Sequence, residues 1–145
     1  MIWVIDASVA VRWFIEQEAH PHSDAVLERI VDEPDRFAVP ELFTFEVFAV
    51  LQRIHPDALE VFRAGILPLL QGGLFRQPLT ERIIEKAEYF IRLGLTGYDA
   101  CYAALAHDLQ GKWLTFDKKA HNLIWRDNVS FCLLDEMPPN WLDKV

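Results

Sequence analysis

The first apolar stretch of the chain constrains its fold most, because it ends at an acid. Residues 2–5 read Ile-Trp-Val-Ile, three β-branched side chains and one aromatic, and Asp6 follows directly. Such a run is typical of a strand buried on both faces of a parallel sheet. An aspartate at the carboxyl end of that strand lies at the edge where open α/β sheets build their ligand sites. Asp6 is therefore the first candidate site residue.

Further strands and helices alternate along the 145 residues, a length that fits one domain over residues 1–145. Short apolar runs predict strands at 37–39, 112–117 and 130–134, with a weaker candidate at 74–77. Apolar residues at helical spacing predict helices over 8–15, 24–31, 41–54, 58–70, 81–93, 98–107 and 118–123. The alternation predicts right-handed βαβ crossovers and an α/β fold, with helices on both faces of a parallel sheet of four to five short strands.

Four residues are of the types that begin helices, and we expect helix starts at Ser23, Pro40, Asp57 and Thr80. The helix over 41–54 is so apolar that we expect it to be almost wholly buried, with Glu46 as its single interior acid. Cys101 and Cys132 match neither a disulfide framework nor a metal-binding pair, so we expect buried, reduced thiols.

Three further acids share with Asp6 the apolar or aromatic neighbours that ordinary surface acids lack; they are Glu46, Asp99 and Asp117. Burying several carboxylates close together without a cation is costly or forces their protonation. A divalent metal removes that cost. Oxygen ligands, with no histidine or cysteine at metal-binding spacing, favour Mg²⁺ or Mn²⁺.

Each of the four acids also has a structural interpretation. Asp6 and Asp117 each precede an expected helix and could cap it. Asp99 lies three residues after Thr96, which is the spacing of a capping box. Glu46 is in the middle of a helix and cannot cap, so its alternative is a buried ion pair with an arginine.

The sequence also resembles a known family in four motifs, which fall in the order and spacing of PIN domains. They are Val-Ile-Asp6-Ala-Ser8-Val with Arg12-Trp13, Pro40-Glu-Leu with Glu46-Val, Leu95-Thr-Gly-Tyr98-Asp99-Ala-Cys-Tyr102-Ala-Ala-Leu-Ala, and Leu114-Thr115-Phe-Asp117. The chain looks most like the VapC toxins of toxin–antitoxin pairs. That resemblance implies a PIN-like three-layer α/β/α sandwich and a metal-dependent endoribonuclease.

The resemblance also implies roles for single residues. The acids that would hold Mg²⁺, with Mn²⁺ possible, and carry catalysis are Asp6, Glu46, Asp99 and Asp117. Ser8 and Thr115 occupy positions where relatives often carry a hydroxyl near the metal. Arg12 stands where many such toxins have lysine, and we expect it to contact substrate phosphate.

The formal charge of −8 argues against a broad basic surface for nucleic acid. Without the four candidate acids, 18 acidic residues still face 14 basic ones, so RNA would have to be bound locally. The resemblance implies two protein partners, a cognate antitoxin and a second copy of the chain. Apolar residues at Phe43, Phe45, Phe48 and 62–70 offer surface for such contacts.

No apolar run approaches the roughly 18 to 20 residues of a membrane span, and the N-terminus lacks a secretory pattern, so we expect a cytoplasmic protein. Two other functions remain open: a PIN nuclease of RNA processing without an antitoxin, and a catalytically inactive PIN-like interaction module. A phosphoryl-transfer receiver is disfavoured, since no second acid adjoins Asp6.

Overall fold

The computed structural model describes residues 1–143, which form a five-stranded sheet with every neighbouring pair of strands parallel. The strands are β1 (Trp3–Ile5), β2 (Phe37–Pro40), β3 (Phe75–Gln77), β4 (Lys112–Thr115) and β5 (Ser130–Cys132). Their order is β3-β2-β1-β4-β5, so β1 lies at the centre. The expected parallel α/β sheet is confirmed, including its weakest strand.

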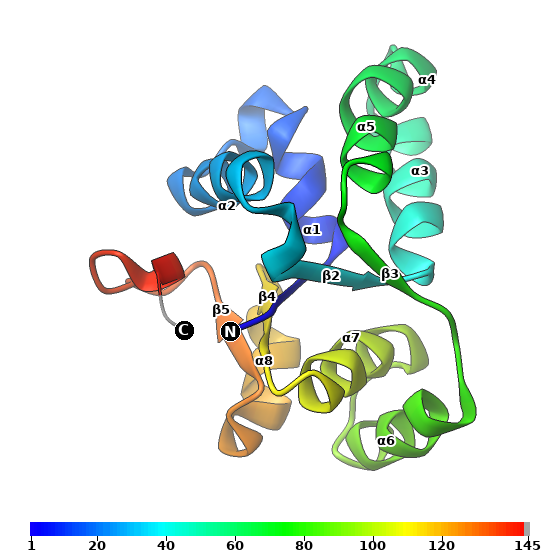
Figure 1. The fold of residues 1–145 in the computed structure, drawn as a ribbon, viewed down its shortest axis with the longest axis vertical. Helices are drawn as coiled ribbons and strands as arrows, with labels where there is room; N and C mark the ends of the chain where they lie inside the picture. The colour runs from blue at the N-terminus through cyan, green and yellow to red at the C-terminus, as the bar shows by residue number, and fades with distance from the viewer. Residues whose placement is uncertain (144–145) are drawn as a thin grey trace.

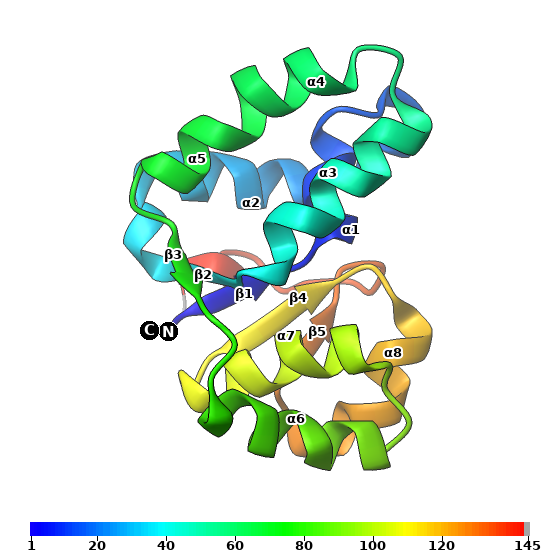
Figure 2. The same cartoon turned by 90° about the vertical axis from the view of Figure 1, so that its right-hand side faces the viewer.

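Helices cover both faces of this sheet. They are α1 (Ala7–Ala10), α2 (Pro21–Asp32), α3 (Leu42–Ile54), α4 (Ala58–Val61), α5 (Leu67–Gln71), α6 (Glu81–Arg92), α7 (Gly97–Asp108) and α8 (Lys118–Ile124). Figure 1 gives the labels, and Figure 2 shows α2 to α5 on one side of the sheet and α6 to α8 on the other. The expected three-layer sandwich is confirmed.

Short turns complete the chain. The 3₁₀ turns are Val11–Trp13, Glu16–Glu18, Pro34–Arg36, Trp125–Asp127 and Trp141–Asp143, and a π-helical turn, Phe62–Ile66, joins α4 to α5. The helix expected over 58–70 is thus interrupted by this turn, and Pro68 stands in the first turn of α5, where its missing N–H costs little. None of the helices within residues 1–143 has the length and apolar character that a membrane crossing requires.

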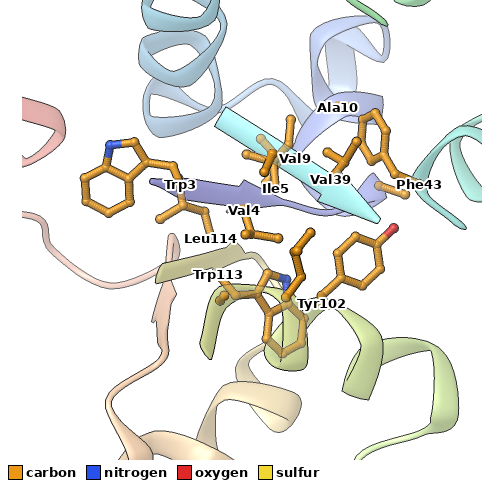
Figure 3. Close-up of a cluster of buried hydrophobic side chains, with 14 of the residues drawn as sticks. Trp3, Val4, Ile5, Val9, Ala10, Val39, Phe43, Tyr102, Trp113 and Leu114 are labelled. Carbon is orange, nitrogen blue, oxygen red and sulfur yellow. The ribbon is translucent and has the colours of Figure 1, made fainter. Parts of the chain in front are cut away.

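The core forms where both helical layers meet the central strand. Trp3, Val4 and Ile5 are fully buried, as a strand covered on both faces requires (Figure 3). On α7, four alanines are buried at 1% exposure or less: Ala100, Ala103, Ala104 and Ala106. Because these side chains are small, α7 packs closely on the sheet, and this packing places the N-terminal turn of α7 beside the carboxyl ends of the strands.

The carboxyl ends of β1 and β4 are neighbours. Ile5 pairs with Leu114 in the parallel register, so the residues that follow each strand emerge at one edge. From β1 the chain moves to β2 and β3, and then returns to β4 on the other side of β1. Open α/β sheets bind ligands at such a reversal of strand order, so the edge beside Asp6 is where a site is expected.

Two of the expected helix starts are wrong. Helix α2 begins at Pro21, and its cap is His20, whose Nδ1 accepts a hydrogen bond from the His22 N–H at 3.0 Å. Ser23 lies inside that helix and donates its hydroxyl to the His20 carbonyl at 2.8 Å. Pro40 ends β2, because it still pairs with β3.

Of the other two expected helix starts, only one has a side chain that caps its helix. Thr80 accepts the Ile83 N–H at 3.3 Å and caps α6, as expected. Asp57 stands at the start of α4 but makes no capping hydrogen bond through its side chain. Cys132 is buried and Cys101 only half-buried, and both are free thiols.

The expectation that α3 is almost wholly buried is wrong. Phe43, Val47 and Leu51 form its buried stripe, whereas Phe45 is 67% exposed and Phe48 is 43% exposed. The helix belongs to an outer layer, so only one face meets the core. Of the residues expected to offer apolar contact surface, Phe43, Phe62, Ile66 and Leu70 lie in the core instead.

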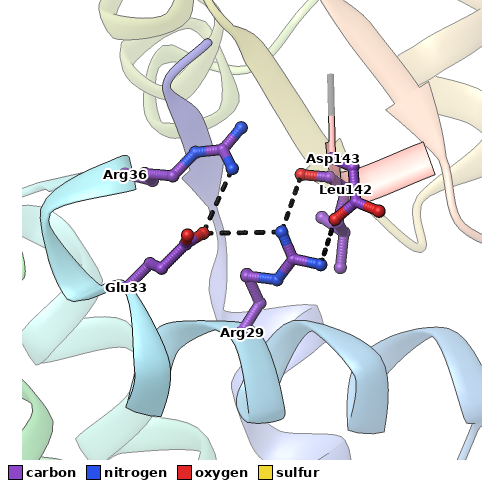
Figure 4. Close-up of polar contacts among 5 residues, drawn as sticks. All are labelled: Arg29, Glu33, Arg36, Leu142 and Asp143. Carbon is purple, nitrogen blue, oxygen red and sulfur yellow. Dashed lines mark hydrogen bonds and ion pairs between the residues drawn. The ribbon is translucent and has the colours of Figure 1, made fainter. Parts of the chain in front are cut away.

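Helix α2 contacts residues 141–143 near the end of the described chain. Arg29 pairs with Asp143, donates to the Leu142 carbonyl at 3.3 Å and contacts Glu33 at 3.4 Å (Figure 4). The Trp141 ring is buried against Trp3, with centroids 5.8 Å apart. The amino-terminal end of β1 is therefore covered by the end of the described chain.

Candidate active site

Asp6 is the most buried of the four candidate acids, with 7% of its surface exposed. It caps α1, because Oδ1 accepts the Ser8 N–H at 2.9 Å and the Ser8 hydroxyl at 2.5 Å. Its other oxygen, Oδ2, accepts the Trp113 indole N–H at 2.9 Å. Burial raises the pKa of Asp6, and these hydrogen bonds oppose the rise because they favour the ionised form. The cap and the candidate site therefore use the same carboxylate.

Two hydroxyls join the ends of β1 and β4 around Asp6. Ser8 Oγ accepts the Phe116 N–H at 3.0 Å while it donates to Asp6. Thr115 Oγ1 accepts the Asp117 N–H at 3.1 Å, and its hydroxyl also favours the ionised form of Asp6. Both residues that were expected near a metal thus lie next to Asp6, where they hold the two strand ends together.

Glu46 reaches the same edge from the first half of α3. It is half-buried, and its Oε1 accepts the Tyr102 hydroxyl at 2.6 Å. Burial raises the pKa of Glu46, the Tyr102 hydrogen bond lowers it, and nearby Asp99 raises it further. The alternative of a buried arginine partner is wrong, since the structure gives Glu46 a neutral donor.

Asp99 lies in the first turn of α7. Thr96 caps that helix by accepting the Asp99 N–H at 3.1 Å, so the capping spacing expected from the sequence is real. The carboxylate itself is free of ion pairs among the described residues. Burial first, and then repulsion by Asp6 and Asp117, raises the pKa of Asp99 to about 6.

Asp117 is the exposed member of the group and caps α8. Its Oδ1 accepts the Ala120 N–H at 3.0 Å. It follows β4, whose carboxyl end adjoins that of β1, so it lies at the same sheet edge as Asp6, and its charge raises the pKa of Asp99. The structure therefore brings charges of Asp6, Asp99 and Asp117 within electrostatic reach of one another, with Glu46 beside Asp99.

These carboxylates have the chemistry that a divalent cation needs. They are hard oxygen donors, and residues 1–143 provide no lysine or arginine ion pair for any of them. Burial raises the pKa values of Asp6, Glu46 and Asp99, and neighbouring carboxylates raise those of Glu46 and Asp99 further. Across the same residues no three histidine, cysteine, aspartate or glutamate side chains are already drawn together as a metal cluster. The oxygen donors are of the type that Mg²⁺ or Mn²⁺ prefers, and water would have to complete the coordination of a bound ion.

Arg12 lies on the Asp117 side of the site. Its guanidinium stacks over the Phe116 ring, 4.0 Å from the centroid, and its Nη1 donates to the Glu18 carbonyl at 3.0 Å. Its Nε is buried without a hydrogen-bond partner in the described chain. Lys118, also close to the site in sequence, is paired with Asp135 at 2.6 Å. Arg12 is thus the better placed cation.

Sequence reasoning missed two aromatic residues that contact the acids. Tyr102 binds Glu46 and Trp113 binds Asp6, each through a single hydrogen bond. Tyr102 lies three residues after Asp99, on the next turn of the same helix, and that spacing could have drawn attention to it. Trp113 comes from the neighbouring strand β4, where nothing in the local sequence signals the contact.

An apolar pocket of about 220 Å³ lies beside the acids. Exposed side chains of Phe45, Leu79 and Tyr98 border it, and none of the four acids lines it. Phe45 and Tyr98 directly precede Glu46 and Asp99 in the sequence. The pocket therefore adjoins the site, and its lining suits an apolar group rather than a metal or a phosphate.

Comparison with solved structures supports the fold. The structure of FitAcB from Neisseria gonorrhoeae aligns with a TM-score of 0.72 and 16% identity, over 93% of this chain and 100% of the other. VapC20 of Mycobacterium tuberculosis, described as a sarcin-ricin loop cleaving toxin, aligns with a TM-score of 0.61 and 15% identity, over 83% and 93%. A toxin–antitoxin complex from Klebsiella pneumoniae aligns with a TM-score of 0.59 and 16% identity, over 81% of this chain and 88% of the other.

At these identities the likeness to solved structures establishes the fold alone. None of the curated proteins compared with the chain matches it in sequence. A family model described as PIN domain matches residues 3–124, which include all four candidate acids. The chain therefore belongs to the PIN domain family.

Proposed function

We propose that this protein is a metal-dependent endoribonuclease, the toxin of a type II, VapBC-like toxin–antitoxin pair. The observation that carries the proposal is the set of four carboxylates that share one sheet edge and have no basic ion partner in the described chain, among which the charges of Asp6 and Asp117 raise the pKa of Asp99. Such an arrangement is unfavourable without a cation, so a protein of no catalytic function has no physical reason to keep it.

In this proposal Asp6, Glu46 and Asp99 hold Mg²⁺, or Mn²⁺, directly or through water, and Asp117 completes the site or helps to hold a second ion. A bound divalent cation lowers the pKa of water and neutralises charge that builds on a phosphate. Burial raises the pKa of Asp6, and the hydrogen bonds from Ser8, Thr115 and Trp113 favour its ionised form, which is the form that binds a cation.

The substrate is proposed to be RNA, bound locally. Arg12 is the cation that we assign to substrate phosphate, because its guanidinium is fixed on Phe116 at the end of β4 and forms no ion pair with an acid within residues 1–143. Ordered, planar donors of this kind suit phosphate oxygens. The overall charge of −8 means that affinity for RNA depends on few such contacts.

Two protein partners are proposed, an antitoxin and a second copy of the chain. Their support is the exposed apolar surface beside the site, which includes Phe45, Leu79 and Tyr98. Surfaces of this kind are typical of protein contacts. A nuclease of this type acts on intracellular RNA, which makes the cytoplasm the expected compartment.

Cleavage of total RNA by the purified protein tests the proposal, with Mg²⁺, with EDTA, and with the Asp99→Asn variant. We expect cleavage that needs the metal and is lost in the variant. Retained cleavage in EDTA would contradict metal dependence. No cleavage by the wild type, together with no metal binding, would favour the inactive interaction module. Cleavage that no protein encoded beside the gene suppresses would favour a nuclease of RNA processing.

A further inference from the structure

Two aromatic side chains form a stacked pair directly beneath the candidate site. The rings of Tyr102, on α7, and Trp113, on β4, have centroids 6.0 Å apart and planes inclined by only 13°. Both are almost completely buried, with 1% of Tyr102 and none of Trp113 exposed. Figure 3 shows them side by side below the central strand.

Each member of the pair donates one hydrogen bond to a different acid. The Tyr102 hydroxyl binds Glu46 Oε1 at 2.6 Å, and the Trp113 indole N–H binds Asp6 Oδ2 at 2.9 Å. The acids belong to elements that are far apart in sequence, and the pair connects them through the core. Because both donors are buried, a donor that lost its acceptor would be left unsatisfied, which holds each carboxylate in one place.

We infer that Tyr102 and Trp113 act together as positioning residues that fix Glu46 and Asp6 relative to each other and so set the affinity of the site for a divalent cation. The inference rests on the proposed function, because it assigns a purpose to the same acids. Tyr102 and Trp113 do not bind the metal themselves; they hold the acids that do, from the side of the core.

The expected magnitude follows from the behaviour of partners that orient metal ligands. Their removal typically weakens metal binding by about 10- to 100-fold. A carboxylate that has lost its fixed donor samples several rotamers, so part of the free energy of metal binding is spent on ordering it again. Loss of either donor should therefore raise the Kd for the metal by a larger factor than it lowers kcat at saturating metal.

The first test compares Tyr102→Phe with Tyr89→Phe. The Tyr89 hydroxyl also donates to a carboxylate, Asp127, at 2.6 Å, but that pair is exposed and away from the four acids. Both variants lose one hydroxyl and keep the ring. We expect Tyr102→Phe to raise the Kd for Mn²⁺, measured by calorimetry on the metal-free protein, by about 10-fold or more, and Tyr89→Phe to leave it unchanged.

The second test compares Trp113→Phe with Trp3→Phe. Both indoles are fully buried, but Trp3 Nε1 has no hydrogen-bond partner among the described residues. Either variant loses a similar volume from the core, and only Trp113→Phe also removes a donor to Asp6. We expect weaker Mn²⁺ binding in Trp113→Phe alone. If that variant does not fold, Tyr102→Phe decides the question.

RNA cleavage measured as a function of Mn²⁺ concentration separates metal affinity from general structural damage, since damage to the fold would not be reversed by added Mn²⁺. We expect excess Mn²⁺ to restore most of the kcat of Tyr102→Phe. An unchanged Kd in a folded Tyr102→Phe overturns the inference and leaves the nuclease proposal intact. A wild-type protein that binds neither Mn²⁺ nor Mg²⁺ overturns both.

Discussion

The backbone N–H of Asp99 donates to Thr96 Oγ1 at 3.1 Å, so the residue that completes the cap of α7 does so through its main chain. Its carboxylate is left for the site, where burial and the charges of Asp6 and Asp117 raise its pKa to about 6. A substitution at Asp99 can therefore remove the site carboxylate and keep the helix cap. At Asp6 the same carboxylate serves both, so a substitution affects both.

The Asp99→Asn variant should lose metal-dependent RNA cleavage without losing stability. Asparagine keeps the main-chain cap and removes a charge that the fold disfavours. The shift from 3.8 to about 6 corresponds to roughly 3 kcal/mol if fully realised, and solvent screening of this partly exposed group reduces it to about 1 kcal/mol. Denaturant unfolding in EDTA at pH 7 should show the variant to be at least as stable as the wild type; a clear loss of stability would contradict this account of Asp99.

The same pKa gives the pH dependence of that difference a definite sign. A carboxyl whose pKa is raised on folding binds its proton more tightly in the folded state, so its contribution to stability falls as pH rises from about 4 to about 6. His20 and His121, whose pKa values are lowered by burial, act in the opposite direction near pH 6.

Subtracting wild type from Asp99→Asn removes the histidines from the comparison. The free-energy difference of unfolding, measured in EDTA, should be small near pH 4 and reach its full size above pH 6. A difference that does not change with pH would show that Asp99 has an ordinary pKa in the folded protein.

Asp6→Asn should be less stable than Asp99→Asn in the metal-free protein. Both oxygens of Asp6 accept hydrogen bonds, from Ser8 on one side and from Trp113 on the other. An asparagine must turn its NH₂ group toward one of these donors, which leaves a buried donor unsatisfied at a cost of about 1–3 kcal/mol. Thermal unfolding of the two variants under identical conditions measures the order, and equal stability would contradict it.

The place of Asp6 was predictable because a buried strand followed by an acid is a local pattern. Glu46 was predictable for a similar reason, since its neighbours in the helix are apolar. Their hydrogen-bond donors were not predictable, because Tyr102 is 56 residues from Glu46 and Trp113 is 107 residues from Asp6. Those contacts depend on how closely α7 packs on the sheet and on the register between β1 and β4.

The errors in the helices have physical causes as well. The exposure of Phe45 could not be predicted from composition. Helix α3 has apolar residues on every face, but as an outer-layer helix it packs only one face against the core. The start of α2 was misplaced because an imidazole accepts the capping hydrogen bond at His20, a role that usually belongs to a hydroxyl or carboxylate.

Arg12→Ala should weaken RNA binding while metal binding stays unchanged. The guanidinium stacks on Phe116 at 4.0 Å and lies beside the site, whereas Arg126 stacks on Trp125 at 5.5 Å on an exposed turn. The matched control is therefore Arg126→Ala. Loss of one phosphate contact should raise KM. It should also reduce the slope of log K for RNA binding against log salt concentration by about one. Equal effects of the two substitutions on KM would remove Arg12 from the substrate site.

Arg29→Met should destabilise the protein by about 1–2 kcal/mol without changing cleavage at saturating metal. Arg29 is three-quarters covered and joins α2 to Leu142 and Asp143 (Figure 4). Methionine keeps most of the aliphatic stem and leaves the Leu142 carbonyl without its donor. In the control, Arg63→Met, the lost partner is Glu60 in an exposed pair, for which we expect less than about 0.5 kcal/mol. Because Arg29 acts at the amino-terminal end of β1 and the acids lie at its carboxyl end, a selective loss of kcat in Arg29→Met would show that the two ends are coupled, contrary to this structure.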